Sequence, residues 1–417
     1  MFQQLEKQLV CLLERSVERY CRDSSLAPPD PVVFHTLSLE IPKEKDFGDF
    51  SSALAMRLAS LWRKNPQEVA SGLVAIAKAL LAKSPAKALV KDIEVKGAGF
   101  INIFLTDQVF FDVLRQINVS GADCAKTDFG VGKRVLLEFV SANPTGPLSV
   151  AHARQAAVGD ALANILSLAG YRVEKEYYLN DEGNQINILG RSIDLRYQEL
   201  GGQSVVFPED HYQGQYIVDL ARALYDDEST RKKIERLGAE GRASFFIDYG
   251  VEQICGMIRH ELDDFGVHFD TWYSQKTLGR SGKIEKALAF LKKKGLLYES
   301  EGALWFKSTQ FGDDKDRVLH KSDGTYTYIT PDIAYHEDKF KRGFEKLINL
   351  WGPDHHGYIP RIKAAVQAFG KDRAALEIVI IQLATLFRQG QPVPMSTRKG
   401  EYVTLREVVT EVGRDAS

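Results

Sequence analysis

The residues from 134 to 179 follow the order strand, loop, helix, glycine, strand. An apolar run at 134–140 predicts a buried strand, and the apolar residues of 158–169 recur at the spacing of one helix face. Gly170 follows as a helix C-cap, and 171–179 predicts a second strand. Two strands joined through a helix lie parallel in one sheet. The chain is therefore expected to be an α/β protein with a Rossmann-like parallel sheet.

A natural division lies at residues 119–133, which are rich in Gly, Asp and Lys and poor in large apolar side chains. Helix-like and strand-like patterns before it predict a small α+β domain over 1–122. We expect a second, larger domain over 123–417, with helical insertions at approximately 190–310. Two domains also suit a chain of 417 residues, because single cores seldom grow beyond about 300 residues.

Composition excludes several classes of protein. Hydrophobic residues make up 44% of the chain and charged residues 26%, which is typical of a globular protein. The longest apolar stretch, around 378–387, is broken by Gln382 and Thr385, whereas a membrane helix needs about 20 apolar residues, so we expect no membrane span. The four cysteines lack metal-type spacing, which indicates free thiols in a reducing cytoplasm.

The loop after the first strand is the usual place for a ligand in such a fold. It contains Asn143, Pro144 and Gly146, and His152 falls in the first turn of the following helix. The free N–H groups of a helix N-terminus attract phosphate, and His152 could donate a hydrogen bond to a phosphate oxygen. His152 could equally well cap or pack against its helix.

A second polar segment, 351–358, follows a predicted strand. Asp354 and His355 within it could contact a ribose and a base. The adjacent histidines His355 and His356 could also suggest a metal. Only one carboxylate is close and the cysteines are distant, so we expect no metal bound by the protein.

A third segment, 394–400, carries two neighbouring cations, Arg398 and Lys399, before a glycine. They could neutralise the charge that grows on a pyrophosphate leaving group. Taken alone, this segment could also be a solvated charged turn.

In this order the three segments resemble the class I aminoacyl-tRNA synthetases, and specifically the arginyl-tRNA synthetase family. Residues 144–152, Pro-Thr-Gly-Pro-Leu-Ser-Val-Ala-His, resemble that family's Pro-Thr-Gly-Pro-Leu-His-Val-Gly-His. Residues 395–400, Met-Ser-Thr-Arg-Lys-Gly, resemble its Lys-Met-Ser-Lys-Ser segment, and 351–358 match its Trp-Gly-x-Asp-His-x-Gly-Tyr segment. Further similar stretches lie at 46–50, 97–102, 180–185 and 265–272.

The resemblance implies an arginine–tRNA ligase, which joins arginine to ATP with Mg²⁺ and passes the arginyl group to the 3′ end of arginine tRNA. It implies catalytic roles for His152, Ser149, Arg398 and Lys399. It implies ATP contacts for Pro144, Gly146, His152, Gly352, Asp354, His355, Met395 and Ser396. We also expect a tRNA-contacting N-terminal domain, a monomer in the cytoplasm, and no C-terminal anticodon-binding helical domain.

The arginine site can be argued from chemistry as well. A guanidinium binds best to carboxylates in planar, paired geometry. Glu138 lies on the first strand, and Asp332 could supply a second carboxylate beside an aromatic wall from Tyr328. The resemblance assigns arginine contacts to these residues and to Ser141 and Asn143. Asp332 could instead simply begin a helix, where an acidic residue is favourable.

Three positions depart from the family pattern: Ser149 stands for histidine, Ala151 for glycine and Pro394 for lysine. Losing one donor to a transition state typically costs about 10²–10³ in rate. Two alternatives therefore stay open, namely a weakened paralogue that binds tRNA without charging it and a small-molecule nucleotidyltransferase. Arginine-dependent exchange between ATP and pyrophosphate, measured with tRNA present, distinguishes the three functions.

Overall fold

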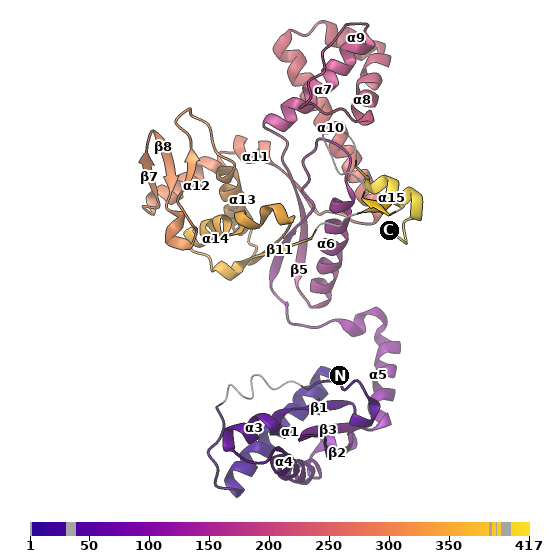
Figure 1. Ribbon diagram of the computed structural model, residues 1–417, viewed down its shortest axis with the longest axis vertical. Helices are drawn as coiled ribbons and strands as arrows, with labels where there is room; N and C mark the ends of the chain where they lie inside the picture. The colour runs from indigo at the N-terminus through magenta and orange to yellow at the C-terminus, as the bar shows by residue number, and fades with distance from the viewer. Residues whose placement is uncertain (1, 31–38, 383–385, 389, 393–401) are drawn as a thin grey trace. The chain divides into compact units, whose positions relative to one another are not determined.

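The computed structural model describes residues 2–30, 39–382, 386–388, 390–392 and 402–417 (Figure 1). The chain divides into two compact units, Met1–Ala125 and Lys126–Ser417. The predicted boundary after residue 122 falls within the short 3-10 helix η3 (Gly121–Ala125) at the end of the first unit.

The first unit contains a three-stranded antiparallel sheet in the order β1–β3–β2. Its strands are β1 (Phe50–Ser52), β2 (Val90–Lys96) and β3 (Phe100–Leu105). Helices α3 and α4 pack on the sheet, and α1 packs on α4. The helices of this unit are α1 (Phe2–Asp23), η1 (Lys45–Phe47), α3 (Leu54–Trp62), α4 (Pro66–Leu81), η2 (Pro85–Ala88) and α5 (Asp107–Ser120).

The second unit is built on a five-stranded sheet in the order β11–β10–β4–β5–β6, with every neighbouring pair parallel. The strands are β4 (Arg134–Glu138), β5 (Arg172–Leu179), β6 (Thr271–Ser274), β10 (Lys346–Trp351) and β11 (Leu376–Ile380). From β4 the chain adds β5 and then β6 on one side of β4, and it later adds β10 and then β11 on the other side. The order therefore reverses between β4 and β10, which confirms the expected Rossmann-like parallel sheet.

Helix α6 (Val150–Leu168) joins β4 to β5 and ends before Gly170, as predicted; Gly170 has a φ of 88°. The first strand, however, ends at Glu138, earlier than the predicted residue 140. Val140 and Ser141 have φ values of 64° and 39°, which lie in the left-handed region and cannot continue a strand. This break turns the chain into the loop that carries several predicted site residues.

The range 190–310, where insertions are expected, also contains β6, which pairs with β5 at the edge of the sheet and separates two groups of elements. A helical bundle precedes β6 (Figure 1), formed by α7 (Asn184–Leu200), α8 (Gln215–Asp226), α9 (Glu228–Glu235) and α10 (Ala239–Phe265).

A second group of elements follows β6 and contains a small antiparallel sheet, β7–β8–β9. The elements of this group are α11 (Gln275–Arg280), α12 (Lys283–Lys293), β7 (Leu297–Ser300), β8 (Ala303–Phe306), η4 (Ser308–Phe311), β9 (Arg317–His320) and α13 (Ile329–Lys341). The remaining elements are η5 (Pro353–Tyr358), α14 (Ile359–Ala368), η6 (Arg373–Ala375), β12 (Phe387–Arg388), β13 (Gln391–Pro392) and α15 (Leu405–Val412).

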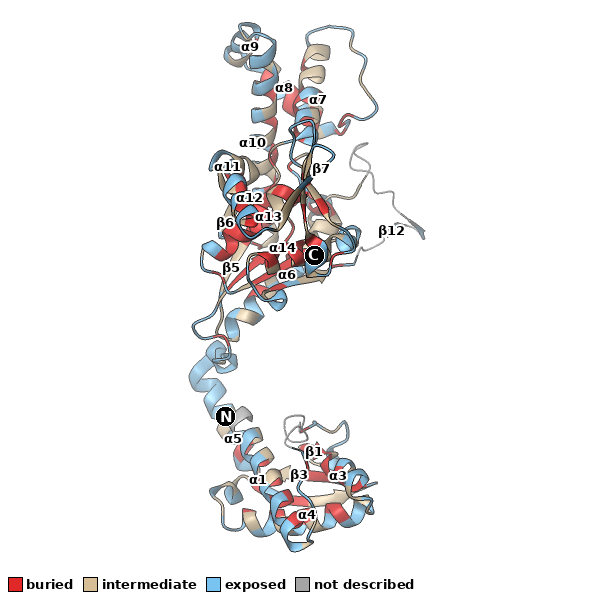
Figure 2. Ribbon diagram, turned by 90° about the vertical axis from the view of Figure 1, so that its left-hand side faces the viewer, coloured by how far each residue is buried: buried red, intermediate tan, exposed pale blue. Residues whose placement is uncertain are grey.

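The core of the second unit lies on both faces of the parallel sheet (Figure 2). Val135 and Leu137 of β4 belong to one buried cluster, together with residues of α6 and α10. Leu136 points the opposite way, because successive side chains of a strand alternate, and it joins a second cluster with residues of α13 and α14. Helices therefore cover both faces of the sheet. Within the described ranges, no helix is long and apolar enough to cross a membrane.

Candidate active site

A cavity of about 530 Å³ lies where β4, β5 and β10 end at their carboxyl side. Its wall includes Glu138 and the turn after β4, Asn180 after β5, and Gly352 after β10, with Asp332 contributed by α13. In a doubly wound sheet, ligands bind at this edge and beside the strand where the order reverses. The position of the cavity therefore follows from the topology of the sheet.

Most of the predicted site residues come together here. Those that line the cavity are Glu138, Ser141, Asn143, His152, Tyr328, Asp332, Gly352, Asp354 and His355. Gly146 lines an adjoining cavity of about 320 Å³, which shares Asn143 and His152 with the first. Pro144 is buried and lines neither cavity. The predicted residues Met395, Ser396, Arg398 and Lys399 lie outside the described residues.

Asp332 supplies a carboxylate in the first turn of α13, where the sequence predicted it. Its side chain accepts a hydrogen bond from the Tyr358 hydroxyl at 2.9 Å. Burial raises the pKa of Asp332 to about 7, and the nearby Glu138 charge adds to this rise, while Tyr358 and Lys339 oppose it. A cation placed beside Asp332 would favour its ionised form, because opposite charges stabilise one another.

Glu138 is buried, and both of its carboxylate oxygens already have partners in the protein. Lys339, which is fully buried on α13, forms an ion pair with Oε2 of Glu138. The Ser141 hydroxyl donates to Oε1 at 3.2 Å. Sequence reasoning missed Lys339, although it lies two helical turns after Asp332 and so on the same face of α13.

A chain of hydrogen bonds leads from Lys339 back to the backbone of Asp332. The Lys339 ammonium donates to Oδ1 of Asn349 at 3.3 Å, and Nδ2 of Asn349 lies 3.0 Å from Nε2 of His336. Nδ1 of His336 donates to the carbonyl oxygen of Asp332 at 2.8 Å. Burial and the Lys339 charge lower the pKa of His336 to about 3, so this imidazole is neutral. Every member of this chain therefore has a consistent donor and acceptor role.

His152 is also neutral, and its tautomer is fixed. The backbone N–H of Ser149 donates to Nδ1 of His152 at 3.1 Å, so the ring proton must sit on Nε2. Burial lowers the pKa of His152 to about 4. The imidazole can therefore present an N–H donor to the two cavities that it lines.

Ser149 lines neither cavity. It is buried and is the N-cap of α6, with its side chain accepting from the backbone of the first helical turn. Its hydroxyl lies 3.2 Å from Nδ1 of His152. The structure therefore places Ser149 behind His152, as a residue that orients the imidazole, rather than among the groups that face a ligand.

The aromatic wall also differs from the expectation. Tyr328 lies at the opening of the cavity with 84% of its surface exposed. The buried aromatic side chains of the wall are Tyr178 and Tyr335, whose ring centroids are 4.4 Å apart. Sequence reasoning missed both, because an aromatic residue in a strand or a helix usually indicates nothing more than the core.

Asp354 and His355 form an exposed rim of the cavity, with side chains that are 78% and 56% accessible. A Cβ on Gly352 would lie 2.5 Å from Oδ1 of Asp354, so a larger residue here would require this exposed side chain to turn aside. Across the described part of the chain, no group of three or more His, Cys, Asp or Glu side chains could hold a metal ion.

The chain just after segment 394–400 lies against the loop that precedes α6. The N–H of Leu405 donates to the carbonyl of Leu148 at 2.7 Å, and the N–H of Val150 donates to the carbonyl of Val403 at 3.2 Å. Glu261 of α10 accepts the N–H of Leu148 at 3.1 Å and faces Arg406 at 3.4 Å. These bonds hold residues 403–406 against the chain at the start of α6 and against α10.

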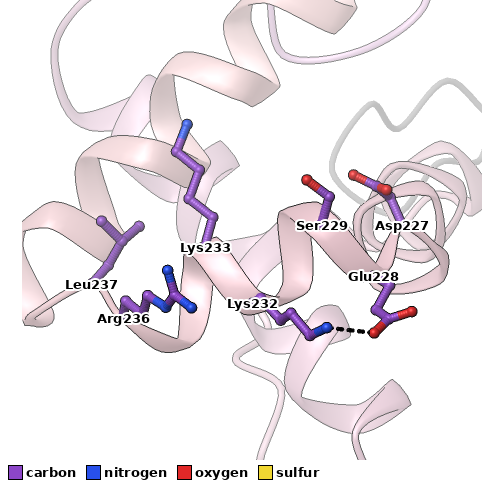
Figure 3. Close-up of a pocket in the computed structure, with 7 residues that line it drawn as sticks. All are labelled: Asp227, Glu228, Ser229, Lys232, Lys233, Arg236 and Leu237. Atoms are coloured by element: carbon purple, nitrogen blue, oxygen red, sulfur yellow. Dashed lines mark hydrogen bonds and ion pairs between the residues drawn. The ribbon is translucent and has the colours of Figure 1, made fainter.

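A separate hollow lies on the surface of α9 (Figure 3). Its lining mixes both signs of charge, and Lys232 pairs with Glu228 at 2.6 Å. None of the predicted site residues lines it. We assign no ligand to this hollow.

Two family profiles match the chain. The first, "tRNA synthetases class I (R), catalytic domain", matches residues 114–417, and the second, "Arginyl tRNA synthetase N terminal domain", matches 12–105. The chain belongs to the arginyl-tRNA synthetases of class I. The resemblance found in the three segments is confirmed.

Individual relatives agree with this family. The arginine–tRNA ligase of Desulfosudis oleivorans is 49% identical over 384 residues, which are 92% of this chain and 68% of that protein. The arginine–tRNA ligase of Bacillus subtilis is 48% identical over 378 residues, with 91% and 66% covered. The chain thus spans about two thirds of the length of these arginyl-tRNA synthetases. The Thermus thermophilus arginyl-tRNA synthetase structure, at 21% identity, shows the same fold with a TM-score of 0.65 over 99% of this chain and 70% of that one.

Proposed function

We propose that this chain activates arginine with MgATP to form arginyl-adenylate, and then transfers the arginyl group to the 3′ end of arginine tRNA. The observation that supports this most directly is Asp332, a buried carboxylate within the cavity at the strand ends, whose pKa is raised to about 7 and which a bound cation would keep ionised. A guanidinium is a permanent cation with paired donors, which suits a single carboxylate of this kind.

The arginine site, in this proposal, is centred on Asp332. Tyr178 and Tyr335 provide flat walls for the apolar stem of arginine. Asn143 is exposed beside them and donates to Gln185 at 2.9 Å, so its amide can exchange that partner for the α-amino or carboxylate group of arginine. Ser141 holds Glu138 in place, as its hydroxyl donates to that carboxylate.

For ATP, the proposal assigns the phosphates to the N-terminus of α6 and the nucleoside to the rim of Asp354 and His355. The Nε2–H group of His152 donates to an α-phosphate oxygen. Arg398 and Lys399 are proposed to neutralise the leaving pyrophosphate. Mg²⁺ enters with ATP as part of the substrate and screens the phosphate charges when bound.

The reaction then needs positioning more than proton transfer. A carboxylate oxygen of arginine attacks the α-phosphorus, the new O–P bond forms as the bond to the bridging oxygen breaks, and pyrophosphate leaves with the electron pair. The cavity holds the two reacting groups together, and the His152 donor stabilises the charge on the phosphate.

The test is exchange of labelled pyrophosphate into ATP, run with arginine or lysine and with or without arginine tRNA. We expect exchange with arginine that needs tRNA, and none with lysine. Binding of tRNA without exchange would favour the weakened paralogue. Exchange that ignores tRNA would favour a small-molecule nucleotidyltransferase.

We further propose a cytoplasmic monomer. All four cysteines are free, which fits a reducing compartment. The molar mass measured by light scattering during size-exclusion chromatography tests the monomer. A mass equal to two chains would contradict it.

A further inference from the structure

A lysine ammonium lies inside the wall of a site that is proposed to bind a cation. Lys339 has no exposed surface, and its ammonium contacts Glu138, Asn349 and the ring of Tyr335, whose centroid is 4.2 Å away. All three of these neighbours line the cavity. Burying an ammonium is costly unless it is paired, so its position calls for an explanation.

The partners of Glu138 limit what this carboxylate can do for a ligand. Oε2 is taken by Lys339 and Oε1 by Ser141, which itself accepts the N–H of Tyr178 at 3.1 Å. A guanidinium that took both oxygens of Glu138 in paired geometry would compete for them with the ammonium and the hydroxyl, and an ammonium that lost Glu138 would stay buried beside the neutral Asn349 oxygen and the Tyr335 ring. Asp332, by contrast, has a hydroxyl partner and, among the described residues, no ammonium in ion-pair contact.

We propose that Lys339 is a positioning residue of the arginine site, which holds Glu138 in a neutral pair and leaves Asp332 as the single uncompensated carboxylate for the guanidinium. The inference rests on the proposed function, and it changes the role expected for Glu138. Glu138 becomes the partner that allows Lys339 to be buried, while Asp332 contacts the substrate.

The charges around Asp332 agree with this division of roles. The titratable and charged side chains that interact with its carboxylate are Glu138 at the end of β4, Tyr178 of β5, Lys339 of α13 and Tyr358 of η5. Beyond them, His336 of α13 bonds to the carbonyl of Asp332, and Arg361 of α14 lies over the ring of Tyr358. His336 is neutral, and Glu138 and Lys339 offset one another. Arginine then adds one positive charge beside one negative charge.

A double-mutant cycle on Glu138 and Lys339 tests the proposal, with arginine affinity measured by calorimetry on the full chain in the presence of tRNA. K339M leaves the Glu138 charge uncompensated beside Asp332, which favours the protonated form of Asp332 and frees Glu138 to leave its place, and E138Q leaves the ammonium charge uncompensated near the guanidinium. We expect each single variant to weaken arginine binding at least tenfold. We expect E138Q/K339M, in which both charges are gone, to return to within about threefold of the wild type.

Proton release gives a second readout that a purely structural role would not change. In K339M the Glu138 charge acts on Asp332 without compensation, so more Asp332 is protonated at pH 7 and arginine binding should release more protons than in the wild type. The number of protons released is obtained by measuring the binding enthalpy in two buffers of different ionisation enthalpy. The control is K341M on the same helix, since Lys341 is exposed and pairs only with Glu337 among the described contacts. K341M should leave affinity and proton release unchanged.

Two results would overturn the proposal. If Glu138 binds the guanidinium itself, E138Q/K339M stays as weak as E138Q. If the pair is only structural, folded K339M binds arginine with the affinity and proton release of the wild type. Should K339M fail to fold, E138Q and the double variant decide the question. A wild-type chain that binds no arginine would instead refute the proposed function.

Discussion

At the residue scale, the chemistry of His152 is decided by its neighbours. The N–H of Ser149 fixes the proton on Nε2, and burial keeps the ring neutral with a pKa of about 4. A histidine in this state offers one donor and does not titrate near neutral pH. Its contribution to phosphate binding should therefore be constant between about pH 6 and 9.

We expect H152A to lower the rate of arginine-dependent exchange by about 10²–10³, the typical cost of one lost donor to a transition state. Arginine affinity should change little. S149A is the matched comparison, because it keeps the backbone N–H that donates to His152 and loses the hydroxyl, which caps α6 and lies 3.2 Å from Nδ1. It should cost about 0.5–2 kcal/mol of stability with a much smaller loss of rate. Equal rate losses in both variants would contradict this assignment.

The ionisation of Asp332 predicts how arginine binding depends on pH. Its pKa is about 7, and its proton must leave before the carboxylate can pair with a guanidinium. Affinity should therefore rise with pH and level off, being about tenfold weaker at pH 6 than at pH 8, as the ionised fraction dictates. Calorimetric titration between these values measures it. D332N should bind weakly at every pH, and a wild-type affinity that falls as pH rises would exclude Asp332 as the contact.

At the element scale, α6 can reach β4 closely because it carries a glycine at the contact. A Cβ on Gly159 would lie 2.3 Å from the ring of Phe139, the buried residue that follows β4. This contact sets the distance between the helix and the loop that begins the site. Both Gly159 and Phe139 are needed for this contact, since a side chain smaller than Phe139 would leave a void beside the glycine.

We expect G159A to destabilise the chain by about 1–3 kcal/mol through overpacking, measured by urea unfolding. G256A is the control in the interior of α10, where nothing lies within 4 Å of the added Cβ. It should be neutral or stabilising by about 0.5–1 kcal/mol, because alanine favours a helix. A G159A chain as stable as G256A would show that α6 can shift freely.

Glu261 ties three elements together, since it accepts the N–H of Leu148 and faces Arg406 at the start of α15. E261A should cost about 1–3 kcal/mol, because it leaves a buried N–H without an acceptor. E261Q keeps an acceptor and should lose less. R406A removes only an exposed partner and should cost at most about 1 kcal/mol. Urea unfolding ranks the three variants, and a larger loss in R406A than in E261A would contradict the argument.

At the scale of the whole molecule, the chain has separate hydrophobic cores in its two units. One cluster runs from Leu5 to Val109, and the others begin at Val135 or later. The proposed arginine and ATP contacts all belong to the second unit. Ligand binding should therefore stabilise the two units unequally.

We expect arginine at about 100 times its dissociation constant to stabilise residues 126–417 by about 2.7 kcal/mol, by mass action alone. Hydrogen exchange followed by mass spectrometry should show slower exchange in the core strands β4 and β5, and no change in β2 and β3. The D332N chain is the control, and arginine should not slow its hydrogen exchange in any of these strands. Equal protection of both units would mean that they unfold together.

The α/β class, the parallel sheet and the family of this protein could all be predicted from the amino-acid sequence. These features depend on local periodicity and on the order of short motifs, which the chain carries directly. The sequence also placed Glu138, Ser141, Asn143, His152 and Asp332 in one site. The ends of elements could not be predicted in the same way. The apolar run predicts a strand as far as Val140, but the left-handed residues Val140 and Ser141 end it at Glu138.

The partners and the protonation of the site residues, by contrast, follow from the three-dimensional arrangement of the chain. Lys339 and Glu138 are 201 positions apart, and no local pattern indicates that they meet. The same holds for the exposure of Tyr328 and for Ser149 lying behind His152. The physical reason is that charge states and hydrogen bonds depend on burial and on neighbours in space, which the fold brings together from distant parts of the chain.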